Sequence, residues 1–190
     1  MKYKYKLTGL TLVEMIVSIS IVAIVSSLFI ANYHSTNKRA DLVMSAQNLV
    51  ADIHGAQNNS LGLVKYNNAV PAGGWGVQFN LRSPNEYKVF ADLNAPGTEG
   101  YLEYDEYTEG LISAGARQTN LSDQIIISDL RVGGEPVKWA NVTFLPPDPI
   151  TNINSDLGAS STLDIELTEV PSGFKKTVQV NFLGLAEVID

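Results

Sequence analysis

The chain has 190 residues, and 20 acidic side chains against 13 basic ones give it a formal net charge of −7. An excess of negative charge disfavours binding to nucleic-acid phosphates, and the absence of cysteine excludes disulfides, thiolate metal sites and a thiol nucleophile. The length allows one long helix and one domain of ordinary size.

The first nine residues are a basic leader that carries Lys2, Lys4 and Lys6 and no acid. An apolar run follows over residues 10–31, and Glu14 is its only charged side chain. As a helix this run would reach roughly 33 Å, enough to cross a hydrocarbon core of about 30 Å. The sequence therefore predicts a transmembrane helix over residues 10–31, with the leader lysines on the cytoplasmic side.

Three interpretations of this N-terminus are open. A basic segment followed by an apolar one is the usual form of a cleaved secretory signal peptide, but no small-x-small cleavage site follows the run. An uncleaved anchor explains the length but leaves Glu14 unexplained, because a carboxylate at membrane depth is costly. Cleavage between Gly9 and Leu10, on the cytoplasmic side, accounts for the whole stretch and makes glutamate the fifth residue of the mature chain.

Gly9, Leu10 and Glu14, with the apolar run after them, resemble the class III signal of type IV prepilins and of the pseudopilins of type II secretion systems. The resemblance implies that a prepilin peptidase cuts after Gly9 and methylates the amine of Leu10. It also implies a single-pass protein of the inner membrane, with its C-terminal domain outside, that later enters a pilus or pseudopilus. The implied partners are that peptidase, other subunits, the membrane and an inner-membrane assembly platform.

Glu14 has an assembly role in this interpretation. The α-amine of Leu10 and the carboxylate of Glu14 are each costly to bury alone and far less costly when paired. In a straight helix the amine cannot fold back onto its own Glu14, whereas a neighbouring subunit shifted by about one turn can present its carboxylate. We therefore predict an intersubunit pair that fixes the axial register, as a buried polar residue does in a coiled coil.

The helix is expected to continue over residues 32–61. Its apolar residues recur at three- and four-residue steps, which is typical of an amphipathic helix, and they are Leu42, Val43, Ala46, Leu49, Val50, Ile53 and Ala56. Gly62 is a plausible terminator.

Residues 62–190 are predicted to form a β-rich globular domain. Alternating apolar and polar positions predict strands over residues 75–79, 86–90, 124–132, 137–144, 163–167, 178–182 and 185–189. The proline-rich stretch over residues 145–161 is expected to be a surface loop. The predicted fold class is therefore α+β: a pilin-like long N-terminal helix, transmembrane in its first half, packed on an antiparallel β-sheet domain.

More narrowly, the helix stripe, the strand Trp75–Phe79 and the ending Val178–Gly184 resemble the minor pseudopilins of the GspH and FimT type. This implies a minor pilin or pseudopilin, a structural subunit of a type IV pilus or of a type II secretion pseudopilus. The alternative is a binding or adhesion module displayed on a filament or membrane. No GxSxG, HExxH or Walker-type phosphate-binding motif occurs, so we predict no catalytic residue and no enzyme.

One loop has the composition of a metal site. Asp92, Asn94 and Asp105 lie around two glycines, and oxygen ligands in a tight loop suit Ca²⁺. The spacing and the bidentate glutamate of an EF-hand are missing, and the same residues are typical of a turn with solvated acids. Calcium is therefore an alternative for this loop, and no other cofactor is predicted.

Overall fold

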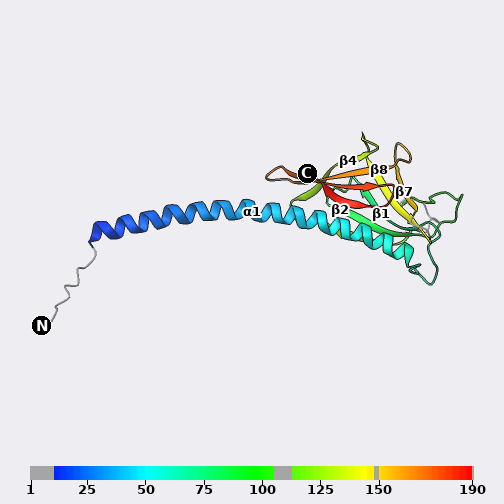
Figure 1. Ribbon diagram of the computed structural model, residues 1–190, viewed down its shortest axis with the longest axis horizontal. Coiled ribbons are helices and arrows are strands. Elements are labelled where there is room, and N and C mark those ends of the chain that lie inside the picture. The colour runs from blue at the N-terminus through cyan, green and yellow to red at the C-terminus, as the bar shows by residue number, and fades with distance from the viewer. Residues whose placement is uncertain (1–10, 105–112, 148–149, 190) are drawn as a thin grey trace. The chain divides into compact units, whose positions relative to one another are not determined.

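The computed structural model describes residues 11–104, 113–147 and 150–189. By its contacts the chain divides into two units, residues 1–38 and residues 39–190. Helix α1 (Leu12–Leu61) belongs to both units and is drawn in blue and cyan in Figure 1. Its end at Leu61 agrees with the terminator expected at Gly62.

The first unit is helical from Leu12 onward, and its side chains over residues 11–28 are exposed. Within the described residues we find no helix whose length and hydropathy suffice to cross a membrane. This corrects the predicted transmembrane segment over residues 10–31, and with it the predicted single-pass location in the inner membrane. Glu14 and the serines at positions 18, 20, 26 and 27 interrupt the apolar run.

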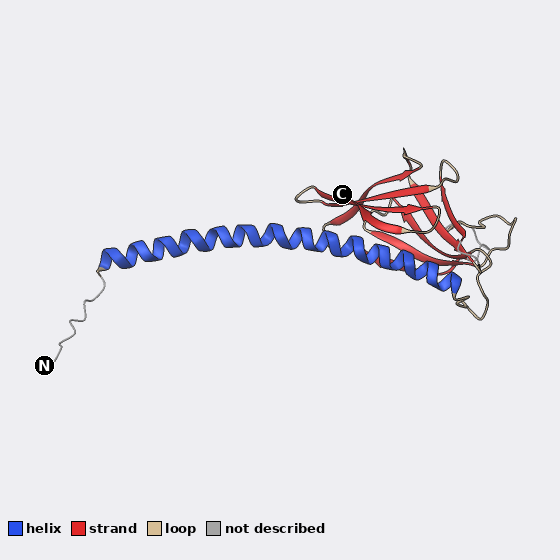
Figure 2. Cartoon of the chain, viewed as in Figure 1, coloured by secondary structure: helices blue, strands red, loops and turns tan. Residues whose placement is uncertain are grey.

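The second unit contains the strands, drawn in red in Figure 2. They form two five-stranded sheets, in the orders β3-β2-β1-β6-β7 and β10-β9-β8-β4-β5. Every pair of neighbouring strands is antiparallel. The strands are β1 (Gly74–Asn80), β2 (Glu86–Asp92), β3 (Ser113–Asn120), β4 (Ile125–Val132), β5 (Glu135–Pro136), β6 (Trp139–Leu145), β7 (Ile150–Ser155), β8 (Thr162–Glu169), β9 (Phe174–Asn181) and β10 (Ala186–Ile189).

The predicted fold class is wrong in two respects. The structure has two antiparallel sheets, not one. Helix α1 also does not pack on a sheet along its length: among its described side chains, those of residues 12–28 are exposed, and the buried apolar ones begin at Leu42. Alternation along a strand shows which side chains share a face, but not which strands pair, so the sequence could not separate the two sheets.

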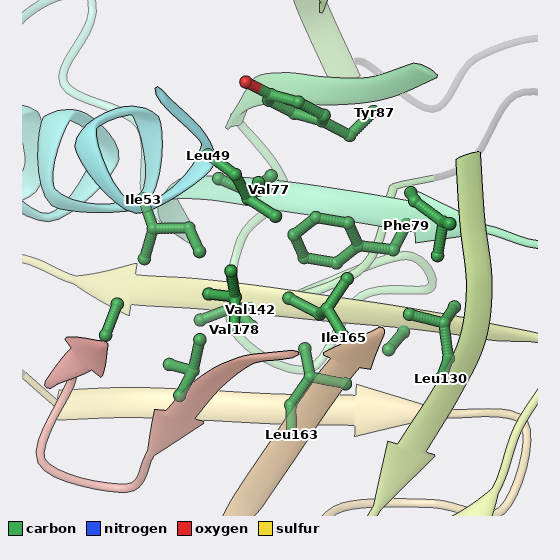
Figure 3. Close-up of a cluster of buried hydrophobic side chains, with 14 of the residues drawn as sticks. Leu49, Ile53, Val77, Phe79, Tyr87, Leu130, Val142, Leu163, Ile165 and Val178 are labelled. Carbon is green, nitrogen blue, oxygen red and sulfur yellow. The ribbon is translucent and has the colours of Figure 1, made fainter. Parts of the chain in front are cut away.

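The core of the second unit is built by the C-terminal part of α1 together with both sheets (Figure 3). Strand β8 alternates strictly between buried and half-buried positions, so one of its faces points into this core. Full burial of an aliphatic or aromatic side chain stabilises the fold by about 1.5–3 kcal/mol. The fully buried members include Leu49, Ile53, Val77, Phe79, Leu130, Val142, Leu163, Ile165 and Val178.

A polar cluster fastens α1 to the first sheet. The Tyr87 hydroxyl of β2 donates to the Asp52 carboxylate of α1 at 2.8 Å, and the Arg117 guanidinium of β3 reaches the same carboxylate at 2.6 Å. Burial, and then the bond to Asp52, raise the pKa of Tyr87. The cluster holds this part of the helix in register with β2 and β3.

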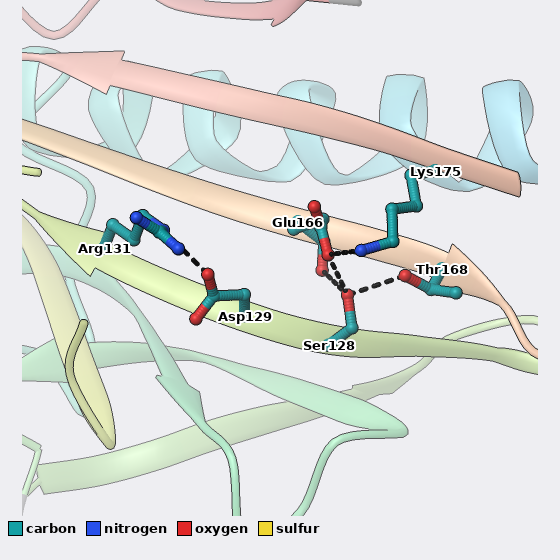
Figure 4. Close-up of polar contacts among 6 residues, drawn as sticks. All are labelled: Ser128, Asp129, Arg131, Glu166, Thr168 and Lys175. Atoms are coloured by element: carbon teal, nitrogen blue, oxygen red, sulfur yellow. Dashed lines mark hydrogen bonds and ion pairs between the residues drawn. The ribbon is translucent and has the colours of Figure 1, made fainter. Parts of the chain in front are cut away.

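Polar contacts also cross-link three strands of the second sheet (Figure 4). Lys175 of β9 donates to Glu166 of β8 at 2.8 Å, and the Ser128 hydroxyl of β4 donates to the same carboxylate at 2.7 Å. The bond from Lys175 lowers the pKa of Glu166. Beside them, Arg131 pairs with Asp129 at 2.7 Å. These partly exposed groups give the second sheet a charged outer face.

Candidate assembly site at the start of α1

Glu14 lies in the first turn of α1 and forms a capping box with Thr11. The Thr11 hydroxyl accepts the Glu14 N–H at 3.2 Å, and the Glu14 carboxylate accepts the Thr11 N–H and hydroxyl, each at 3.3 Å. This reciprocal bonding satisfies backbone N–H groups that the start of a helix leaves without intrahelical partners. The negative charge also lies at the positive end of the helix dipole.

The capping role is a function of Glu14 that the sequence reasoning missed, although Thr-x-x-Glu at residues 11–14 is its known signature. Gly9 and Leu10, the predicted cleavage and methylation positions, lie outside the described residues. The predicted pair between Glu14 and the amine of Leu10 stays a prediction. What the structure adds is that the carboxylate is held at the exposed start of the helix.

The segment 12–28 exposes apolar side chains around the whole helix. Leu12 is 75% exposed, Val17 51% and Leu28 67%. Three serine hydroxyls of the segment, those of Ser18, Ser20 and Ser27, donate to carbonyls of the preceding turn of the same helix at 2.7–2.8 Å. Exposed apolar patches of this kind mark interaction sites, so the segment is a candidate assembly surface.

The loop after β2 begins with Asp92 and Asn94, two of the residues considered as calcium ligands, and their side chains make hydrogen bonds within the loop. Asp92 is fully buried, and its two carboxylate oxygens accept the N–H groups of Asn94 at 2.9 Å and of Leu102 at 2.6 Å. The Asn94 amide donates to the carbonyl of Gly100 at 3.1 Å. Burial raises the pKa of the Asp92 carboxyl.

Asp105, the third candidate, lies outside the described residues. Among those that are described, no group of three or more His, Cys, Asp or Glu side chains is placed to hold a metal ion. The structure thus brings Asp92 and Asn94 together, but in hydrogen bonds to their own loop. Calcium binding by this loop stays an untested alternative.

No family model matches the chain, and no curated protein or solved structure is significantly similar to it.

Proposed function

We propose that this chain is a minor pilin or pseudopilin, a structural subunit that a prepilin peptidase processes after Gly9 and that is incorporated into a type IV pilus or a type II secretion pseudopilus. The observation that carries the proposal is the apolar surface exposed around residues 12–28 of α1. Each Å² of apolar surface removed from water contributes about 25 cal/mol. Burial of this apolar surface against the same segment of other subunits therefore strongly favours assembly.

The composition of the segment allows copies of it to pack against one another. No charged residue occurs from Met15 to Asn37, so helices placed side by side over this stretch meet no buried charge. Glu14 is the exception, and the capping box keeps its carboxylate at the helix start, close in sequence to the amine that cleavage at Gly9 would create. A carboxylate and an amine supplied by adjacent subunits then neutralise each other.

A charge placed within the apolar segment tests this proposal. In Val17→Asp an additional carboxylate would be buried between helices without a partner, which costs several kcal/mol. We expect assembly in a host that supplies the prepilin peptidase and platform to be lost, as scored by sedimentation and electron microscopy. Met44→Asp is the matched control, because Met44 is also an apolar residue of α1 and is 59% exposed. Equal assembly of the two variants would remove the proposal.

A further inference from the structure

The turn between β9 and β10 presents apolar side chains from a rigid backbone. Phe182, Leu183 and Leu185 are 59%, 66% and 52% exposed. The Asn181 side-chain oxygen accepts the N–H groups of Leu183 at 2.9 Å and Leu185 at 3.2 Å, and its backbone carbonyl accepts the N–H of Gly184 at 2.8 Å. We call residues 182–185 the apolar turn.

The backbone of the apolar turn lies against the last turns of α1. Gly184 has φ +78°, and a Cβ at this position would lie 2.5 Å from the Gln57 side-chain nitrogen and 2.8 Å from the Thr151 hydroxyl. Only glycine allows so close an approach. The turn thus lies against α1 and β7, while its leucine and phenylalanine side chains are exposed.

A groove of about 610 Å³ opens at the other end of the same unit, where the segment joining β3 to β4 meets the turn between β8 and β9. Its apolar lining includes Leu121, Ile126, Val170 and Pro171. Ser122, also in the lining, accepts a hydrogen bond from Ser45 of α1 at 3.2 Å. We call this the basal groove.

The basal groove and the apolar turn are separated along the helix. The groove lies beside Ser45 and the turn beside Gln57, and at 1.5 Å per residue these positions are about 18 Å apart. A single copy therefore cannot place its own turn in its own groove, whereas two copies stacked end to end can.

Charge restricts what the basal groove accepts. Glu86 and Asp123 are part of its lining, and they repel the acidic surface that prevails in a chain of net charge −7. The apolar turn lies within residues 177–186, a stretch without any charged residue. It is an exposed, uncharged element of this chain that an acidic groove does not repel.

We propose that the apolar turn of one copy docks in the basal groove of the next copy. Such a contact joins two different surfaces, so it repeats from copy to copy as an open filament when the rotation does not close a ring. A four-residue turn buries less than the roughly 1,200 Å² of a stable interface. The contact is therefore weak alone and is populated when other contacts raise the effective concentration; in this respect it rests on the proposed function.

Engineered cysteines test the contact, because the natural chain contains none. Full-length Leu183→Cys and Val170→Cys chains are co-assembled and mildly oxidised, and the mixed disulfide dimer is quantified by mass spectrometry. A disulfide needs Cα atoms about 4.4–6.8 Å apart, so only docked copies form it efficiently. Leu157→Cys replaces Leu183→Cys in the control, since Leu157 is equally exposed at 66%.

We expect the 183–170 disulfide to exceed the 157–170 disulfide several-fold. Filaments that form without this disulfide, or with an equal yield in the control, overturn the docking. Chains that form no filaments overturn the proposed function on which the docking rests. Repeating the experiment in the Val17→Asp background separates the two proposals. A disulfide lost there shows docking that depends on helix assembly, while one that persists supports docking and shows that it does not need the helix.

Discussion

Glu14 caps the start of α1 and has a predicted role in assembly, and a single substitution can separate the two. Its carboxylate closes the capping box with Thr11, and its charge is the predicted partner of the amine of a neighbouring subunit. A glutamine at the third helical position closes a capping box as well as a glutamate does. Replacing the glutamate by glutamine therefore removes the charge and keeps the cap.

We expect Glu14→Gln to be cleaved after Gly9 as the wild type is and to enter filaments poorly. The reason is that the amine of the adjacent subunit loses its counter-charge, while the helix start is unaffected. Mass spectrometry of the mature N-terminus measures cleavage and methylation, and the pelleted fraction measures assembly. Thr11→Ala is the converse control, because it removes the hydroxyl of the cap and keeps the charge. If Glu14→Gln assembles normally, the charge pairing is wrong.

At the scale of elements, the loop that follows β2 depends on one buried carboxylate. Both oxygens of Asp92 accept backbone N–H groups of the loop, and a Cβ at Gly73 would overlap the Asp92 side chain. In Asp92→Asn the amide nitrogen would face one of these two N–H donors. Leaving a buried donor unsatisfied costs about 1–3 kcal/mol.

We expect Asp92→Asn to lower the free energy of unfolding at pH 7 by about this 1–3 kcal/mol in urea titrations, against a near-zero effect for the exposed Asp123→Asn. The difference in the free energy of unfolding between the wild type and Asp92→Asn should widen in acid. Burial raises the folded-state pKa of the Asp92 carboxyl above its usual range. The part of its stabilisation that is linked to protonation is therefore present in acid and declines as the pH rises through the folded pKa, in addition to the hydrogen bonds that it makes at pH 7. A gap that narrows on acidification would contradict the raised pKa.

The sequence predicted the strands in which apolar and polar residues alternate clearly. It missed strands without such an alternation. β1, β2, β6 and β8 contain clear apolar faces and lie where they were expected. β3 was not predicted, and β7 lies inside the expected surface loop. Both are edge strands of the first sheet, and polar sequences such as Ile150–Ser155 are held in place by pairing with a neighbour, which no local pattern reveals.

The candidate site was predictable to the same limited degree. The motif at residues 9–14 is local, so the sequence singled out Glu14 directly. The apolar turn and the basal groove were not recognised, because the groove is assembled from the ends of strands in both sheets and from the turn at Val170. Surfaces formed by distant segments require the tertiary structure.

For the whole molecule, the described core lies in the second unit, and the proposed assembly surface lies in the first. Among the side chains that the structure describes, the buried apolar ones begin at Leu42, and those of residues 12–28 are exposed. Removing residues 1–38 therefore deletes none of the core cluster, which α1 enters through side chains such as Leu49 and Ile53. Stability and assembly should then be separable properties of this protein.

We expect the fragment 39–190 to unfold cooperatively with nearly the same Tm as the full chain and to remain unassembled. Differential scanning calorimetry measures the first property and sedimentation the second. Leu49→Ala calibrates the comparison, because a cavity at this fully buried leucine should cost about 2–5 kcal/mol in either form. A fragment that melts without cooperativity would show that residues 1–38 support the core. If Leu49→Ala lowers the free energy of unfolding equally in the fragment and in the full chain, the stability of the protein resides in its second unit.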